Sequence, residues 1–402
     1  MGKPYDVIVL GARCAGSPLA MLLARRGYRV LLVDKATFPS DTISTHIVQP
    51  RGVAALSRWG LLDDLIATGC PPIHTYSFDF GPISISGTPG NDEAPAAYCP
   101  RRIILDALLV NAAADAAVEV REGFTVDQIL IEDDRVVGVR GHSRGGASVT
   151  ERATVVVGAD GRRSMLAATV APRQYHERPP LLAGYYSYWS GLPMDDRYDI
   201  FIRERRGFGA APTHDGLTLI VGGWPYAEFE TNKKDVERSF LDMLDLAPSF
   251  AARVRDARRE APFVGMPVAN FFRTASGPGW VLVGDAGYTK DPITAQGISD
   301  AFRDAERCSA ALDAALSGRE SFECAMTEYQ RERDEQALPM YELTCQLASL
   351  EPPPPEMLQL LQGIYGNRTA MDGFVRMNAG TISPAEFFSP EHLGPIMAAA
   401  PH

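Results

Sequence analysis

The sequence predicts a mixed α/β (α+β) protein with a discontinuous Rossmann-like dinucleotide-binding domain, an inserted antiparallel-sheet domain and C-terminal helices. Three turns far apart in the chain predict this fold: a glycine loop from Gly11 to Gly16, an Asp-Gly turn at Asp160, and a Gly-Asp turn at Gly284. Each turn follows an apolar run typical of a buried strand, and open α/β sheets bind ligands at the carboxyl ends of their strands. The three turns together predict one dinucleotide that lies across distant parts of the chain.

Composition changes along the chain suggest where the domains divide. Prolines and glycines interrupt short strands between 71 and 90, and aromatic residues alternate with polar ones from about 172 to 270. We therefore expect a dinucleotide domain made of residues 1–70, 98–170 and 272–345, and a substrate domain made of 71–97 and 171–271. Residues 346–402 are expected to form a C-terminal helical segment.

The dinucleotide domain is expected to begin with a βαβ unit. The pattern of apolar residues predicts these elements in order: a strand at 6–10, a helix at 15–26, a strand at 29–33, a helix at 102–116, a meander over 125–153, a buried strand at 154–158, a strand at 280–283 and a helix at 296–316. A further helix is expected to begin at Ser383, because Ser383 and Glu386 form a capping box.

The first turn has the residues that a diphosphate loop needs. Gly11 allows the backbone angles of a tight turn, and Gly16 allows the helix to touch the strand. The first helix then presents free N–H groups to a diphosphate, and Asp34 is placed to bond ribose hydroxyls. Arg13 occupies the position of the usual middle glycine, so its side chain either points away from the phosphates or contacts them.

Composition excludes several classes of function. The 402 residues are 46% hydrophobic and 22% charged, and the net charge of -11 disfavours nucleic acid or an anionic membrane as the main partner. We expect no membrane span, no signal peptide and a cytoplasmic protein. The six cysteines are scattered and expected to be reduced, and the seven histidines form no metal-ligand cluster.

The motifs resemble those of FAD-dependent monooxygenases of the p-hydroxybenzoate hydroxylase type, in a superfamily that includes geranylgeranyl reductases and flavin-dependent halogenases. The resemblance covers roughly residues 5–60, 98–165 and 275–316. It implies FAD as the cofactor, bound by residues from all three segments. The implied set is Gly11, Ala12, Arg13 and Gly16 at the diphosphate, Asp34 and Lys35 at the adenosine ribose, Arg102 at the phosphates, Val126 at adenine, Asp160 at FAD and NAD(P)H, Gly284 and Asp285 at the ribityl chain, and Pro292, Gln296, Gly297 and Ile298 at the isoalloxazine.

Candidate catalytic and substrate residues are fewer. His46 could position a substrate or relay a proton, because histidine titrates near neutrality, although a histidine that only packs a loop is the competing interpretation. Tyr188, Phe208 and Trp224 could line an apolar substrate pocket, although aromatic residues in a sheet more often belong to the core.

The resemblance implies an NAD(P)H-dependent monooxygenase that inserts one oxygen atom from O₂ into a small aromatic or lipophilic substrate through a flavin C4a-hydroperoxide. The chain has no second glycine loop, so NAD(P)H would bind transiently or a separate flavin reductase would supply the electrons. Tyr288 stands where many hydroxylases have histidine, and residues 291–294 resemble the reductase branch equally well. The alternatives are therefore a reductase of carbon–carbon double bonds and a non-enzymatic flavin-binding regulator. Halogenation is a minor alternative, because the Trp-x-Trp-x-Ile-Pro signature of flavin halogenases is absent.

Overall fold

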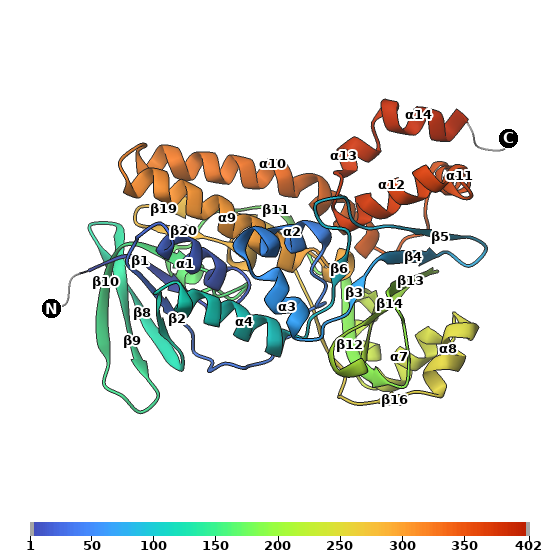
Figure 1. Ribbon diagram of the computed structural model, residues 1–402, viewed down its shortest axis with the longest axis horizontal. Coiled ribbons are helices and arrows are strands. Elements are labelled where there is room, and N and C mark those ends of the chain that lie inside the picture. The colour runs from blue at the N-terminus through green and yellow to red at the C-terminus, as the bar shows by residue number, and fades with distance from the viewer. Residues whose placement is uncertain (1–3, 399–402) are drawn as a thin grey trace.

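The computed structural model describes residues 4–398 and places a mainly parallel sheet next to a mainly antiparallel one. Figure 1 shows the parallel sheet with its helices toward the N-terminal end of the long axis, and the antiparallel sheet toward the other end. The mixed α/β fold class that the sequence predicts is therefore confirmed. No observation tests the domain boundaries, which remain predictions.

The first sheet has five strands joined by parallel pairing at its centre, with antiparallel additions at its edges. Its order is β19 (Ser276–Gly277), β20 (Trp280–Leu282), β10 (Val149–Gly158), β1 (Tyr5–Leu10), β2 (Val30–Val33) and β7 (Glu119–Arg121), with β9 (Arg135–Ser143) attached to β10 and β8 (Phe124–Glu132) attached to β9. Leu10 pairs with Gly158, and Gly158 pairs with Leu282. The three predicted turns therefore leave the sheet at the same edge.

The strand β10 differs from the prediction, which divided it into two strands. Its first half pairs antiparallel with β9, where Val149 lies opposite Gly141, and its second half pairs parallel with β1, where Val156 lies beside Ile8. One continuous strand can pair with both β9 and β1, because its backbone keeps making inter-strand hydrogen bonds along its length while the partner strand changes. The apolar run at 154–158 thus marks a change of burial and not a new strand.

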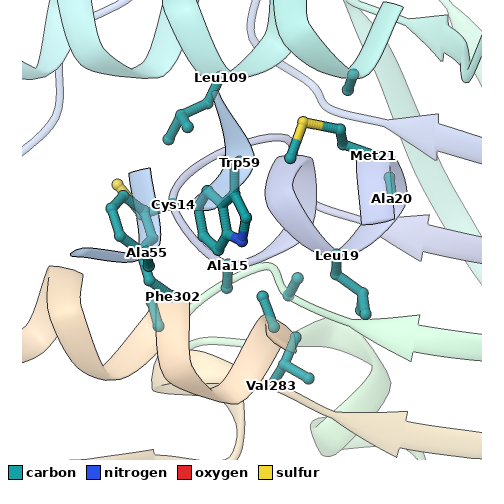
Figure 2. Packing of buried hydrophobic residues seen from close by; sticks show 14 of the residues in the cluster. Cys14, Ala15, Leu19, Ala20, Met21, Ala55, Trp59, Leu109, Val283 and Phe302 are labelled. Carbon is teal, nitrogen blue, oxygen red and sulfur yellow. The ribbon is translucent and has the colours of Figure 1, made fainter. Parts of the chain in front are cut away.

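Helices cover the first sheet and enclose its main core. They are α1 (Gly16–Ala24), α2 (Pro50–Trp59), α3 (Leu62–Ala67), α4 (Arg102–Asp115), α5 (Met165–Val170), α9 (Gly297–Leu316) and α10 (Phe322–Ala348). Figure 2 shows α1 at the centre of this packing, with Leu109 of α4, Trp59 of α2 and Phe302 of α9 around it. Because α1 is buried on all sides, it is apolar around its whole circumference and not on one face alone.

The second sheet has a different core on each face. Its order is β16 (Arg258–Arg259), β12 (Leu182–Ser190), β15 (Thr218–Pro225), β14 (Arg206–Pro212), β13 (Arg197–Arg203), β4 (Thr75–Asp79) and β5 (Ser84–Gly87), with β17 (Val264–Pro267) also on β12. On one face α7 (Val236–Leu244) and α8 (Pro248–Arg255) cover the strands, after the short α6 (Phe229–Asn232). The other face meets the segment near Ile47 and the C-terminal helices.

Smaller elements complete the fold. The strands β11 (Gln174–Arg178), β18 (Asn270–Arg273) and β21 (Tyr288–Thr289) form a three-stranded sheet, β3 (Pro72–Ile73) pairs with β6 (Ala97–Tyr98), and η1 (His214–Gly216), η2 (Tyr226–Glu228), η3 (Gly284–Ala286) and η4 (Pro292–Thr294) are single 3₁₀ turns. The C-terminal helices are α11 (Pro355–Ile364), α12 (Arg368–Ala379), α13 (Pro384–Phe387) and α14 (Pro390–Ala398). The helix predicted at Ser383 is α13, and the Ser383 hydroxyl accepts the Glu386 N–H at 3.0 Å.

Candidate functional site

The glycine loop is as tight as the sequence predicts. Gly11 has a φ of +99°, and a Cβ on it would lie 2.5 Å from the Ala159 carbonyl oxygen. A Cβ on Gly16 would lie 1.8 Å from the Gly11 carbonyl oxygen. The Asp34 carboxylate accepts the Ala12 N–H and the Ala36 N–H, each at 2.8 Å. The end of β2 is therefore fastened to the loop that begins α1.

Arg13 takes part in a charged network that the sequence did not reveal. Its guanidinium pairs with Asp106 and donates to the Ser40 hydroxyl at 3.0 Å. Asp106 is fully buried and also accepts from Arg102 Nη2 at 2.8 Å. Cys14 Sγ lies 3.4 Å from the same carboxylate, and burial raises the pKa of its thiol. Arg13 and Arg102, which are both predicted phosphate ligands, therefore share the buried Asp106 carboxylate of α4 as their counter-ion.

The other two turns meet this loop. Asp160 Oδ2 accepts the Met165 N–H at 2.7 Å, and a Cβ on Gly284 would lie 2.9 Å from the Ala15 Cβ. The Asp285 carboxylate is exposed, yet burial raises its pKa against the opposing effect of nearby cations, which include Lys290. The Asp285 carboxylate is therefore open to solvent and lies close to cationic side chains.

The N-terminus of α9 lies near the turn that contains Asp285. Gly297, its first residue, is exposed, and a Cβ there would meet nothing within 4 Å. Free N–H groups at a helix start favour negative charge. The Gln296 side chain instead contacts protein, because it accepts from Arg51 at 3.0 Å and donates to the Asn378 carbonyl at 3.0 Å. The Ile298 side chain packs in the main core.

A second buried charge network stands behind the first turn of α9. Asp300 pairs with Arg51 and Lys290, and with Arg303 at 3.2 Å. Arg303 also pairs with Asp304 at 2.7 Å. Burial alone would raise the pKa of Asp300, but the three cations lower it well below its ordinary value. No single motif in the sequence signals this network, because its members come from three segments.

His46 lies in an aromatic enclosure on the second sheet. It is fully buried, its φ is +65°, and its Nε2 lies 2.8 Å from the Tyr188 hydroxyl. The Tyr186 ring meets it edge-on with centroids 5.0 Å apart. Burial, reinforced by the Arg102 cation, lowers the pKa of His46 to about 3. The histidine is therefore neutral at physiological pH.

Phe208 and Trp224 lie on the opposite face of that sheet, which corrects the prediction that they line the pocket. Successive side chains of a strand point to opposite faces, so Tyr188 and Trp224 belong to different cores. Phe208 is 3% exposed and Trp224 is 0% exposed, and both pack in the core that α7 and α8 cover. Their size serves packing, as the competing interpretation of sheet aromatics expects.

The remaining predicted residues lie at the edges of this site. Lys35 is exposed beside Asp34, Val126 on β8 is partly buried against the core, and Pro292 begins η4. Their contacts with a cofactor stay predictions. Within residues 4–398 no group of metal-ligating side chains is assembled, and no helix there is long and apolar enough to cross a membrane.

The geometry fits an extended dinucleotide. The glycine positions leave no room for side chains, which is expected where loop and helix approach each other closely. Asp285 and Gly297 at the start of α9 are both exposed, and Arg102 lies close enough to Asp285 to influence its pKa. The loop, Arg102, Asp285 and the start of α9 therefore offer the cationic, acidic and helix-terminal groups that a long diphosphate-containing ligand needs.

Comparison with known proteins identifies that ligand. The family model described as FAD binding domain matches residues 4–343. The chain belongs to this FAD-binding family. It is an FAD-dependent oxidoreductase, as the resemblance implied, since its relatives are halogenases and reductases of that superfamily.

The relatives have diverse activities. The chain is 24% identical over 351 residues to a tryptophan 2-halogenase of Chondromyces crocatus, covering 81% of this chain but only 64% of that protein. It is 28% identical to the digeranylgeranylglycerophospholipid reductase of Methanosarcina mazei, covering 75% of this chain and 73% of the relative. The flavin-dependent brominase Bmp2 has the same fold, with a TM-score of 0.82 at 18% identity over 99% of this chain and 98% of Bmp2.

Proposed function

We propose that the protein is an NAD(P)H-dependent FAD monooxygenase that inserts one oxygen atom from O₂ into a small aromatic or lipophilic substrate. The observation that carries the proposal is the buried His46–Tyr188 pair on the second sheet. This pair lies near the loop that begins α9, because Tyr188 and Ala295 share one core and the Gln49 amide donates to the Thr294 carbonyl. If FAD binds as we propose, this pair would stand close to the ring end of the cofactor.

Bound FAD would supply the redox chemistry, accepting electrons from the donor and activating O₂. The glycine loop, Asp34, Arg102 and Asp285 would hold it, and the start of α9 would stabilise negative charge on the ring. The aromatic enclosure around His46 would exclude water from the reacting substrate.

The chain's own proton chemistry follows from the hydrogen bond between Tyr188 and His46. A substrate hydroxyl would give its proton to the Tyr188 oxygen while the Tyr188 proton passes to His46 Nε2. The depressed pKa of His46 makes it a transient carrier, because the buried imidazolium is unstable and would return its proton through Tyr188 to the product oxygen. Removal of that proton makes an oxygen-bearing aromatic ring richer in electrons, which is what oxygen insertion requires.

A reductase of carbon–carbon double bonds is the second candidate. It is favoured by the digeranylgeranylglycerophospholipid reductases and by a menaquinone reductase of Mycolicibacterium smegmatis that is 26% identical over 331 residues. Halogenation is favoured by the halogenase relatives, but the Trp-x-Trp-x-Ile-Pro signature is missing from this chain.

The experiment begins with a screen of phenols, indoles and isoprenoid quinones for compounds that accelerate NADPH oxidation by the FAD-loaded protein. For a hit, ¹⁸O from ¹⁸O₂ in the product supports the monooxygenase. Anaerobic turnover to a product with two more hydrogens contradicts it in favour of the reductase, and halide-dependent product contradicts it in favour of a halogenase.

Variants then test the role of the hydrogen-bonded pair. Tyr188→Phe and His46→Asn should each lower the oxygenation rate by about 10²-fold with flavin content unchanged, the order that general acid–base catalysis contributes. Tyr185→Phe is the matched control, because Tyr185 is on the same strand but faces the other core. If all three variants have the same oxygenation rate, the hydrogen-bonded pair has no role in the mechanism.

A further inference from the structure

The turn η4 is fixed to the rest of the protein through Asp291, the residue that precedes it. Asp291 Oδ1 accepts the Ile293 N–H at 3.0 Å and so caps the turn. The Asp291 N–H donates to Asn270 Oδ1 at 2.6 Å, and Asn270 Nδ2 donates to the Pro179 carbonyl at 3.2 Å. Asp291 and Asn270 are each 1% exposed. A buried pair of side chains therefore ties η4 to β18.

The turn needs such contacts because its backbone is strained where it ends. Ala295 has a φ of +50°, a conformation that residues with a Cβ rarely adopt. Pro292, the first residue of the turn, is predicted to lie at the isoalloxazine. The cap by Asp291 therefore acts on the segment that is expected to support the flavin ring.

The second oxygen of the same carboxyl group is unusual. Asp291 Oδ2 is buried and has no hydrogen-bond partner within residues 4–398. A negative charge on such an oxygen is costly. Burial raises the pKa of Asp291 to about 7, against the opposing effect of the Ile293 and Leu182 backbone. The group therefore changes its charge near neutral pH.

The charged neighbours of this carboxyl group are engaged elsewhere. The preceding residue, Lys290, pairs with Asp300. On α10 the nearby titratable group is the Cys345 thiol, whose pKa burial raises to about 11. Arg178 and Glu342, which also affect the pKa of Cys345, pair with each other. Within the described chain, no cation therefore offsets the cost of ionising this group.

We propose that Asp291 is a positioning residue for the cofactor, which holds η4 against the isoalloxazine and loosens this turn when its carboxyl group ionises. The protonated group keeps Oδ2 uncharged in dry surroundings. The ionised group must gain water or another donor for that oxygen, and the turn has to move before either can reach it. The inference depends on FAD binding and on the predicted place of Pro292, and it holds whichever reaction the flavin carries out.

The test measures release of flavin from the FAD-loaded protein between about pH 5.5 and about pH 8.5, by the fluorescence of free flavin. Wild type should release flavin about tenfold faster at the upper end than at the lower end, with a midpoint near the pKa of Asp291. Asp291→Asn cannot ionise but keeps an oxygen that accepts the Ile293 N–H. It should hold flavin equally well across the range.

The matched control is Asp235→Asn. Asp235 caps α7 in the same way, accepting the Arg238 N–H at 3.0 Å, but it is exposed. This variant should keep the pH step of wild type. Infrared spectra supply a second readout: the band of a protonated carboxyl group should disappear over the same pH range in wild type and in Asp235→Asn, and should be missing from Asp291→Asn.

Two results would overturn the proposal. The first is a pH step in flavin release that persists in Asp291→Asn. The second is a step in wild type that occurs without loss of the carboxyl band, which would assign it to a histidine. If Asp291→Asn does not fold, the wild-type measurements decide, because ionisation of the carboxyl group and release of flavin must then share one midpoint.

Discussion

The buried carboxylate of Asp300 offers the sharpest test of the electrostatics behind α9. Replacing Asp300 with asparagine keeps the shape of the side chain but leaves Arg51, Lys290 and Arg303 with one fewer negative partner. Asp300 and Lys290 are each only 5% exposed, so water cannot substitute for the lost charge. Removing one partner from a buried ion pair typically costs about 3–5 kcal/mol. We expect Asp300→Asn to lose this much free energy of unfolding, measured by urea denaturation.

The matched control lies on the same helix. Asp313 pairs with Arg26 at 3.8 Å and with Arg319, but its partners are 37% and 61% exposed. Asp313→Asn should therefore cost only about 0–1 kcal/mol, as exposed pairs do. If Asp300→Asn costs no more than Asp313→Asn, the network contributes nothing beyond an exposed ion pair and the reasoning is refuted.

The pH dependence gives a second measurement on the same variant. The folded pKa of Asp300 lies below its unfolded value of about 4, so the unfolded state binds the extra proton in this range. The stabilisation by Asp300 is therefore complete above about pH 4 and is lost as the pH falls toward the folded pKa. Wild type should lose stability more steeply than Asp300→Asn on acidification below pH 4.

Two further predictions concern the first turn and the corrected aromatic residues. Arg13→Gly restores the usual glycine but breaks the pair with Asp106 and the contact with Ser40, so FAD should dissociate about tenfold faster, which fluorescence of the released flavin reports. An unchanged dissociation rate would show that Arg13 only packs the loop. Phe208→Ala should lower the free energy of unfolding by about 3–5 kcal/mol through loss of core packing while the KM for substrate is unchanged. A raised KM without loss of stability would instead show that Phe208 lines the substrate pocket.

The sequence by itself determined the dinucleotide half of this protein. Gly11, Gly16 and Asp34 lie close together in the chain, and local backbone geometry fixes what each can do, so their arrangement was predictable. The two distant turns were also predictable, because a parallel sheet brings the carboxyl ends of its strands to one edge. Family comparison then confirmed an FAD-binding protein.

Only the tertiary structure decided which charges and aromatic rings meet. Asp106 and Asp300 each gather arginines or lysines from separate segments, and sequence spacing carries no record of such contacts. Tyr188 and Trp224 appeared equivalent in an alternating strand pattern, but the helices α7 and α8 cover one face and leave His46 against the other. Successive side chains of a strand point to opposite faces of the sheet. Which segments pack on each face depends on parts of the chain far away in sequence.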